Sequence, residues 1–214
     1  MPVKEEKAML QLRAIGFGFV EQPLFAGWSA DFAPGVSLVI GDESAGKTTL
    51  LRLLARELAP TQGSVCWRGV DVAALPDWES QVFWRDPRAS WPALTPQAWA
   101  EGLAARYPRW GEAAWQAHLD GFGLAPHGFK TMEMLSTGSQ RKVLLAAALA
   151  SGAPLTLLDL PEAALDRASI GYLHQALCAQ DRAAPDSGRV LLVTGYEAQP
   201  QGWYRQQLAL AQRV

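Results

Sequence analysis

The sequence lacks a strong excess of charge of one sign, which sets it apart from proteins that bind nucleic acid through a basic surface. Its 19 lysines and arginines face 21 aspartates and glutamates, giving a formal net charge of −2. Because nucleic-acid binding needs clustered positive charge, this balance predicts that nucleic acid is not a partner. Apolar residues make up 49% of the 214 residues, so we expect one folded domain with a sizeable core rather than disorder.

Cysteine and long apolar runs are also scarce. The two cysteines, Cys66 and Cys178, cannot build a disulfide framework, so reduced thiols in the cytosol are expected. The longest apolar region, residues 143–160, is interrupted at residues 151–154, which argues against a transmembrane helix. The charged N-terminus MPVKEEKAML is not followed by an apolar signal core, so export is not expected. These absences predict a cytoplasmic protein.

Short β-type apolar runs alternate along the chain with helical patterns. We expect buried strands at residues 36–40, 64–68, 155–158 and 189–193. We expect helices at residues 47–58 and 137–150, the second capped by Ser136 and closed by Gly152. Alternating strands and helices favour an α/β fold with a mostly parallel sheet. Residues 84–135 are expected to form a helical lobe inserted in this core.

Residues 41–48 read Gly-Asp-Glu-Ser-Ala-Gly-Lys-Thr and match the phosphate-loop pattern G-x-x-x-x-G-K-[ST] between an expected strand and an expected helix. The glycines let backbone N–H groups wrap a phosphate, and the helix N-terminus adds a positive dipole. Lys47 is expected to act on the outer phosphates as a catalytic cation, and the Thr48 hydroxyl is expected to bind Mg²⁺. The predicted nucleotide contacts are Gly41, Glu43, Ser44, Ala45, Gly46, Lys47, Thr48 and Thr49.

A phosphate loop alone leaves kinases, GTPases and transport ATPases open, and the rest of the chain narrows the choice. Residues 135–142, Leu-Ser-Thr-Gly-Ser-Gln-Arg-Lys, resemble the signature motif of ATP-binding cassette (ABC) proteins. Residues 155–159 resemble a Walker B strand, and residues 163–166 resemble a D-loop. In order and spacing, the chain resembles an ABC nucleotide-binding domain. This resemblance implies a P-loop NTPase fold of ABC type, with an antiparallel β part and the helical lobe.

The resemblance also implies roles for residues outside the phosphate loop. Asp159 would hold Mg²⁺ at a strand end. Ser136 and Gly138, at a helix N-terminus that favours anions, would face the γ-phosphate held by a second protomer, so that two chains enclose two ATP molecules. An aromatic residue stacks on adenine in this family, and counting back from the phosphate loop points to Phe19. Phe17 is the alternative, and a core role for Phe19 stays open.

Three positions depart from the family pattern. Leu160 stands where a glutamate polarises the attacking water, and Gly195 stands where a switch histidine contacts the γ-phosphate. Trp84 takes the place of a glutamine that touches Mg²⁺ and links the site to a membrane partner. Losing a positioned general base costs about 10²- to 10⁴-fold in rate. Glu162 could substitute for the missing base by reaching back, although catalytic geometry tolerates little displacement.

Together these features predict an ATP-binding subunit of an ABC transporter that binds Mg-ATP between two protomers, with slow or absent hydrolysis at its own site. The second protomer would be a copy of this chain or another ABC subunit. A separate transmembrane subunit would span the bilayer, which places this chain at the inner face of the cell membrane. The alternative is a non-hydrolysing, ATP-dependent switch or scaffold.

Overall fold

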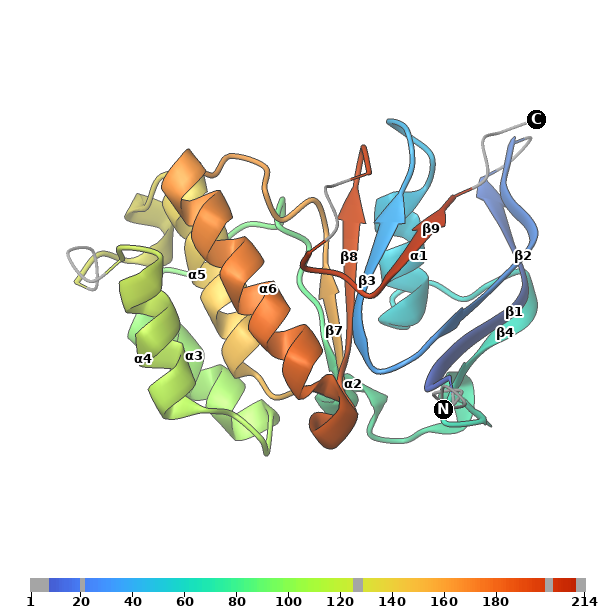
Figure 1. The fold of residues 1–214 in the computed structure, drawn as a ribbon, viewed down its shortest axis with the longest axis horizontal. Helices are drawn as coiled ribbons and strands as arrows, with labels where there is room; N and C mark the ends of the chain where they lie inside the picture. Colours follow the sequence, from blue (N-terminus) through green and yellow to red (C-terminus); the bar gives the residue numbers. More distant parts are fainter. Residues whose placement is uncertain (1–7, 20–21, 125–128, 199–201, 211–214) are drawn as a thin grey trace.

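Two β-sheets and a layer of helices make up the computed structural model, which describes residues 8–19, 22–124, 129–198 and 202–210 (Figure 1). The main sheet is parallel, in the order β6 (Val82–Phe83), β7 (Leu155–Leu158), β8 (Val190–Gly195), β3 (Gly35–Ile40) and β9 (Gln206–Ala209). The second sheet is antiparallel, in the order β2 (Gln22–Phe32), β1 (Leu10–Phe19), β4 (Gln62–Trp67) and β5 (Val70–Asp71). The α/β fold with an antiparallel part, predicted from the sequence, is confirmed.

The central strands of the main sheet are almost continuously apolar and are buried along most of their length. Parallel strands covered on both faces have this character because neither face meets water. Their register places Ile40 beside Gly195 and Leu158 beside Val193. The carboxyl ends of β3, β7 and β8 therefore meet at one edge, where open parallel sheets bind their ligands.

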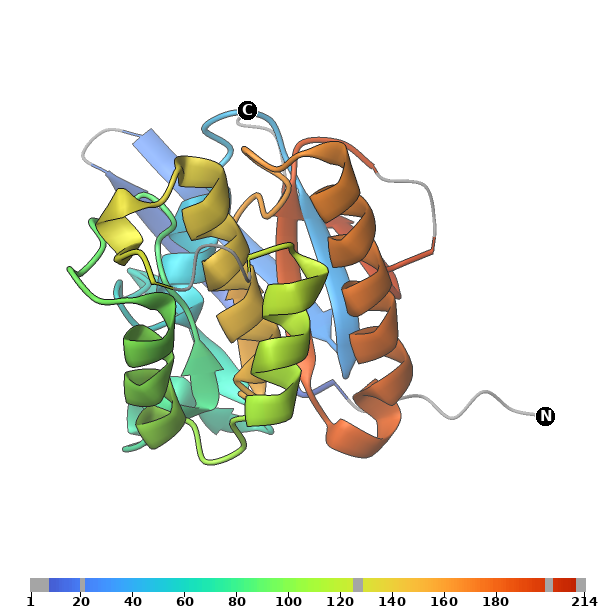
Figure 2. The same ribbon diagram turned by 90° about the vertical axis from the view of Figure 1, so that its left-hand side faces the viewer.

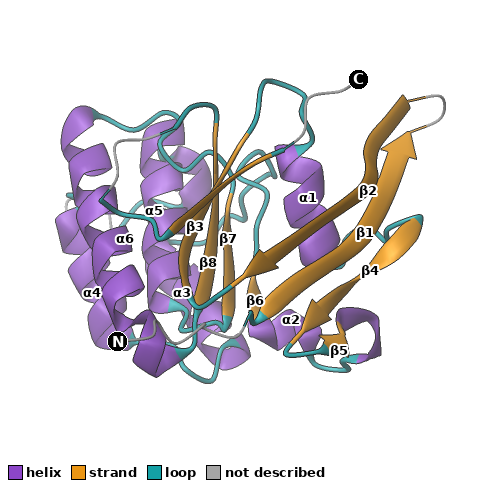
Figure 3. Cartoon of the chain, turned by 45° about the vertical axis from the view of Figure 1, so that its right-hand side comes forward, coloured by secondary structure: helices purple, strands orange, loops and turns teal. Residues whose placement is uncertain are grey.

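Helix α1 (Lys47–Leu54) lies between the two sheets (Figure 3). Its leucines are fully buried and share one apolar cluster with Leu12 of β1 and Val39 of β3. The short helix α2 (Trp78–Gln81) closes this cluster with the buried Trp78, whose indole N–H donates to the Leu54 carbonyl at 2.9 Å. That bond satisfies a carbonyl that the end of α1 would otherwise leave unpaired.

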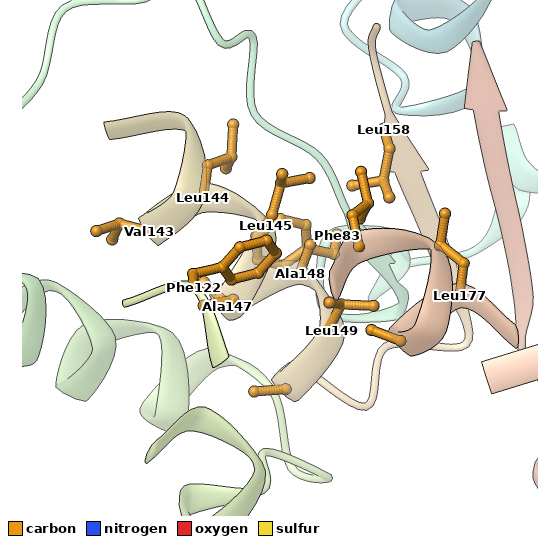
Figure 4. Packing of buried hydrophobic residues seen from close by; sticks show 14 of the residues in the cluster. Phe83, Phe122, Val143, Leu144, Leu145, Ala147, Ala148, Leu149, Leu158 and Leu177 are labelled. Atoms are coloured by element: carbon orange, nitrogen blue, oxygen red, sulfur yellow. The ribbon is translucent and has the colours of Figure 1, made fainter. Parts of the chain in front are cut away.

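The other face of the main sheet carries α3 (Pro96–Arg106), α4 (Glu112–Gly121), α5 (Thr137–Ala150) and α6 (Arg167–Ser187) (Figure 2). Residues 143–150 of α5 are all buried, as expected of a helix enclosed on every side. Leu145 and Leu149 of α5 lie in one cluster with Phe83 of β6 and Leu177 of α6 (Figure 4). Two short 3₁₀ helices, η1 (Val72–Ala74) and η3 (Met132–Met134), complete the described elements.

The expected helix at residues 137–150 is confirmed as α5, and Ser136 caps it by accepting the N–H of Ser139 at 3.2 Å. The expected helix at residues 47–58 is too long, because α1 ends at Leu54. Arg56 takes a left-handed φ of 65° and its guanidinium donates to the carbonyls of Val72 and Leu75. This tertiary contact ends the helix before the proline at position 60.

Within residues 84–135, the first part is not helical: residues 84–95 form a loop that leads from β6 to α3. Helices α3 and α4 follow, and η3 precedes α5. Two expected strands are also displaced slightly, since β4 spans Gln62–Trp67 and β8 spans Val190–Gly195. The loop at residues 84–95 is the segment that matters for the site, because it passes the carboxyl edge of the main sheet.

Arg189 joins the helical layer to the main sheet from a buried position. Its guanidinium donates to the carbonyls of Ala148 and Leu149 at 3.3 Å each and to Thr156 Oγ1 at 3.0 Å. Burial lowers the pKa of Arg189 to about 10. The cation satisfies carbonyls at the C-terminus of α5, where the helix dipole also favours positive charge.

His118 forms a second link within the helical layer, between α4 and α6. Its Nδ1 lies 2.9 Å from the Tyr172 hydroxyl. Burial, helped by the positive charge of Arg189, lowers the pKa of His118 to about 4. The folded protein therefore holds this imidazole neutral at pH values where an unfolded chain would protonate it, since free histidine titrates near about 6.5.

This difference predicts that the free energy of unfolding falls as pH falls from about 6.5 to about 4. In that window the unfolded chain binds up to one more proton at His118 than the folded chain does. The slope from this residue is at most about 1.4 kcal/mol per pH unit. Urea unfolding of the native chain and of His118→Asn across this range should show a flatter profile for the variant. Parallel profiles would contradict the neutral, buried imidazole.

Candidate functional site

The phosphate loop joins the carboxyl end of β3 to α1 and holds Lys47 inside its curve. Lys47 Nζ donates to the carbonyl of Gly41 at 2.5 Å and to that of Asp42 at 2.7 Å. Gly46 has a φ of 96°, and a Cβ there would lie 2.8 Å from Cδ2 of Leu24. Both the backbone conformation and the neighbouring side chain therefore require glycine at this turn.

Lys47 is nearly buried but remains near negative charge. Burial lowers the pKa of Lys47 below its usual value, while Asp159, Asp42 and Glu43 oppose that shift. The ring of Tyr196 adds a cation–π contact, with Nζ 4.2 Å from the ring centroid. Two carbonyls and an aromatic ring thus hold the ammonium group at the loop. A bound anion could replace these contacts.

Asp159 lies at the end of β7 with its carboxylate buried. Thr48 Oγ1 donates to Oδ2 at 2.7 Å, and Thr194 Oγ1 donates to Oδ1 at 2.8 Å. These hydroxyls come from α1 and β8, so the carboxylate joins three elements of the sheet edge. The Asp159 backbone carbonyl accepts a further bond from Arg141 of α5 at 3.1 Å.

A cavity of about 540 Å³ opens at this edge. The residues that line it include members of the phosphate loop, the end of β7 and the loop after β6: Leu24, Glu43, Ser44, Gly46, Lys47, Thr48, Thr49, Pro87, Arg88, Arg141, Asp159, Leu160 and Tyr196. Three cations, Lys47, Arg88 and Arg141, line one space together with two carboxylates. This charge distribution can bind a polyphosphate, because each cation can oppose phosphate charge.

The oxygen atoms of Thr48 and Asp159 fit a magnesium site. A hydroxyl and a carboxylate are the hard ligands that Mg²⁺ prefers, and the metal commonly takes one or two protein ligands plus substrate phosphates. Among the described residues no group of three or more His, Cys, Asp and Glu side chains could hold a metal by itself.

The residues predicted from the sequence do not all line this cavity. Glu43, Ser44, Gly46, Lys47, Thr48, Thr49 and Asp159 line the cavity, and Gly41 contacts Lys47 through its carbonyl. Ser136 and Gly138 lie at the start of α5 and do not line it; a Cβ at Gly138 would lie 2.7 Å from the Ala164 carbonyl oxygen. Ala45 turns the loop by donating to the Asp42 carbonyl.

The adenine-stacking prediction falls on a residue whose side chain lies outside the described part of the chain. Phe19 ends β1, where its backbone pairs with Gln22. Phe17 is partly buried and packs against the cluster around α1. Leu24 of β2 lines the cavity beside Gly46, and the sequence analysis did not single it out.

Glu162 lies beside a second cavity of about 410 Å³, which also borders Leu160, Gly195 and Tyr196. Its carboxylate is 2.7 Å from Nε2 of His174, whose ring stacks on Trp203. Glu162 does not line the cavity of the phosphate loop. The structure thus brings Lys47, Thr48 and Asp159 together and places Glu162 at a neighbouring cavity, which shares Leu160 and Tyr196 with the first.

The structure describes all three positions at which the sequence analysis found a departure from the family pattern. Leu160 takes a left-handed φ of 44°, which is costly for a side chain of this kind, and its N–H donates to Thr194 Oγ1 at 2.9 Å. A Cβ at Gly195 would lie 3.2 Å from Cδ1 of Leu38 in β3. Trp84 packs into the cluster around α1 and does not line the cavity, whereas Arg88 from the same loop does.

Arg88 is the functional candidate that the sequence analysis missed. It lies in the run Trp-Arg-Asp-Pro-Arg at residues 84–88, which carries no periodicity and matches no motif. Only the path of the loop brings it to the phosphate loop. The signal in the sequence was limited to a basic residue close to the place where the family has its metal-contacting glutamine.

The wider comparison agrees with this geometry. A family model described as ABC transporter matches residues 27–163. The chain is 40% identical over 181 residues to the cytochrome c biogenesis ATP-binding export protein CcmA of Rhodospirillum rubrum, covering 81% of this chain and 74% of that protein. It is 37% identical over 178 residues to the protein of the same name from Paramagnetospirillum magneticum, covering 80% of each chain.

Solved structures show the same fold at lower identity. A putative ABC transporter ATP-binding protein from Pyrococcus furiosus superposes with a TM-score of 0.78 at 20% identity, covering 95% of this chain and 98% of that one. A structure described as the ATP-binding subunit of an ABC transporter gives a TM-score of 0.75 at 21% identity, covering 87% and 79%. With a phosphate loop, a buried Walker B aspartate and these relatives, the chain belongs to the ABC transporter family as an ATP-binding subunit.

Proposed function

We propose that this chain binds Mg-ATP at the cavity of the phosphate loop and serves an exporter of the cytochrome c biogenesis type, while hydrolysing ATP slowly or not at all by itself. The observation that carries the proposal is the meeting of Lys47, Thr48 and Asp159 around one cavity. The export role rests on the relatives named CcmA, of which several share 29–40% identity with this chain.

Binding would use the phosphate loop and Lys47. Backbone N–H groups at the start of α1 would contact the phosphates, and Lys47 would leave the carbonyls of Gly41 and Asp42 to meet the outer phosphate. Thr48 and Asp159 would hold Mg²⁺, which would neutralise charge on the phosphates. Glu43, Ser44, Gly46 and Thr49 complete the wall of the site.

Hydrolysis needs a base, and the residue at the family position supplies none. Leu160 carries no proton acceptor, and Gly195 has no side chain to contact a γ-phosphate. Glu162 would have to leave His174 and cross Leu160 to reach the phosphate side. Because a catalytic group must lie within hydrogen-bond reach of the water that it activates, we propose that the missing base is not replaced within this chain.

The position of α5 supports an assembly of two protomers. Its N-terminus, with Ser136 and Gly138, lies outside the chain's own cavity and is available to the ATP of a second protomer. No helix of the described ranges is long and apolar enough to cross a membrane. We propose a dimer with a copy or with a sister ABC subunit, docked at the inner face of the membrane on a separate transmembrane subunit. If the partner is a sister subunit with all its catalytic residues, the N-terminus of α5 of this chain would complete the partner's ATP site.

Lys47→Ala is expected to weaken Mg-ATP binding at least tenfold, because the cation that meets the outer phosphates is lost. Titration of a fluorescent ATP analogue measures the affinity. Lys130→Ala is the control, since that lysine does not line the cavity. Equal affinities for the native chain and Lys47→Ala, with both proteins folded by circular dichroism, would refute the site.

Leu160→Glu is expected to raise phosphate release less than tenfold over the native chain. The substitution restores a carboxylate at the family position, but Gly195 still provides no contact to the γ-phosphate. Phosphate release from Mg-ATP should be compared among the native chain, Leu160→Glu and the isosteric control Leu160→Gln. A much larger gain that is specific to glutamate would show that the absent base alone limits turnover.

A further inference from the structure

The loop after β6 places the guanidinium of Arg88 against two oxygen atoms, those of Thr48 and Asp159, that fit a metal site. Arg88 Nη2 donates to Thr48 Oγ1 at 2.8 Å and to Asp159 Oδ2 at 3.2 Å. The loop itself orients the side chain, because Asp86 accepts the backbone N–H of Arg88 at 2.8 Å and lies 3.6 Å from its Nε. One nitrogen of Arg88 thus contacts both predicted magnesium ligands at once.

The two partners differ strongly in exposure. The Asp159 side chain is 1% exposed, and that of Arg88 is 68% exposed. A buried carboxylate needs compensating charge, and the guanidinium of Arg88 adds to that of Lys47 and Arg141 from the solvent side. Because Arg88 is mostly exposed, water screens part of this attraction, and a stronger cation can displace it.

Magnesium and Arg88 cannot use these oxygen atoms together without close contact between like charges. Each compensates the same carboxylate and lies where a nucleotide's outer phosphates would approach. Arg88 is part of the chain and is therefore always at the site, whereas Mg²⁺ must bind from solution and lose bound water first. A guanidinium also binds phosphate well, through several N–H donors in one plane.

We propose that Arg88 is a built-in cation that competes with Mg²⁺ for Thr48 and Asp159 and so makes nucleotide binding by this chain less dependent on the metal. The proposal rests on the nucleotide site proposed above. Without metal, Arg88 keeps its contact to Asp159 and offers its other N–H groups to the phosphates. When Mg²⁺ binds, Arg88 must leave Thr48 and Asp159. The loss of these contacts reduces the gain in nucleotide affinity that the metal provides.

The test measures affinity for a fluorescent ATP analogue with excess EDTA and again with excess Mg²⁺. For the native chain the metal is expected to improve affinity less than tenfold. In Arg88→Gln, the affinity in EDTA should fall at least fivefold, and the improvement by Mg²⁺ should become at least ten times larger than in the native chain. Arg88→Lys, which keeps a charge but loses the planar donors, should lie between them.

The matched control is Arg85→Gln, in the same loop. Arg85 donates to the Ser90 carbonyl and stacks over Trp91, away from Thr48 and Asp159. Its metal dependence should equal that of the native chain. If Arg88→Gln and the native chain show the same metal dependence within twofold, the competition is refuted. If the native chain binds no nucleotide in either buffer, the nucleotide site itself fails, which is a different result.

A second readout is the Mg²⁺ concentration that gives half of the binding change at fixed nucleotide. This Mg²⁺ concentration should be lower for Arg88→Gln than for the native chain, because the variant lacks the competing cation. An unchanged or higher half-point in that variant would overturn the proposal even if nucleotide affinity changed, since loss of a simple phosphate contact would leave metal binding untouched.

Discussion

The site depends on one buried carboxylate. Asp159 accepts hydroxyl hydrogen bonds from Thr48 and Thr194, so it fixes the end of β7 against the start of α1 and the end of β8. Each hydroxyl is buried or partly buried, and leaving any of these groups unpaired would cost free energy. The parallel register makes the arrangement possible, because it brings three strand ends to one edge. The phosphate loop, the metal ligands and Arg88 are all positioned relative to this group.

The slow hydrolysis that we propose rests on a contrast between two sets of residues in this chain. Lys47, Thr48 and Asp159 surround one cavity, whereas Leu160 and Gly195 offer no chemistry to a water molecule. Leu160 also keeps a left-handed backbone, with its N–H bonded to Thr194. If the chain binds ATP without hydrolysing it, as we propose, nucleotide occupancy rather than turnover would carry the signal to a partner.

The sequence predicted those elements and candidate site residues that depend on patterns of neighbouring residues. The phosphate loop, the capped helix from Thr137 to Ala150 and the aspartate at the end of β7 depend on local spacing, so their patterns sufficed to predict them. The end of α1 could not be predicted, because Arg56 ends it through contacts with residues 72 and 75. Arg88 stayed hidden for a similar reason: its partners are 40 and 71 positions away, and only the folded loop joins them.

The glycine at position 195 has a consequence for engineering this chain. A side chain there would have its Cβ 3.2 Å from Cδ1 of Leu38, a distance at which the core leucine must give way. Close packing makes such adjustments costly. A larger residue introduced at position 195 would therefore require Leu38 to shift, although the neighbouring cavity offers room for the rest of its side chain. Residue 38 of β3 is accordingly the place to alter if a side chain is to be engineered at position 195.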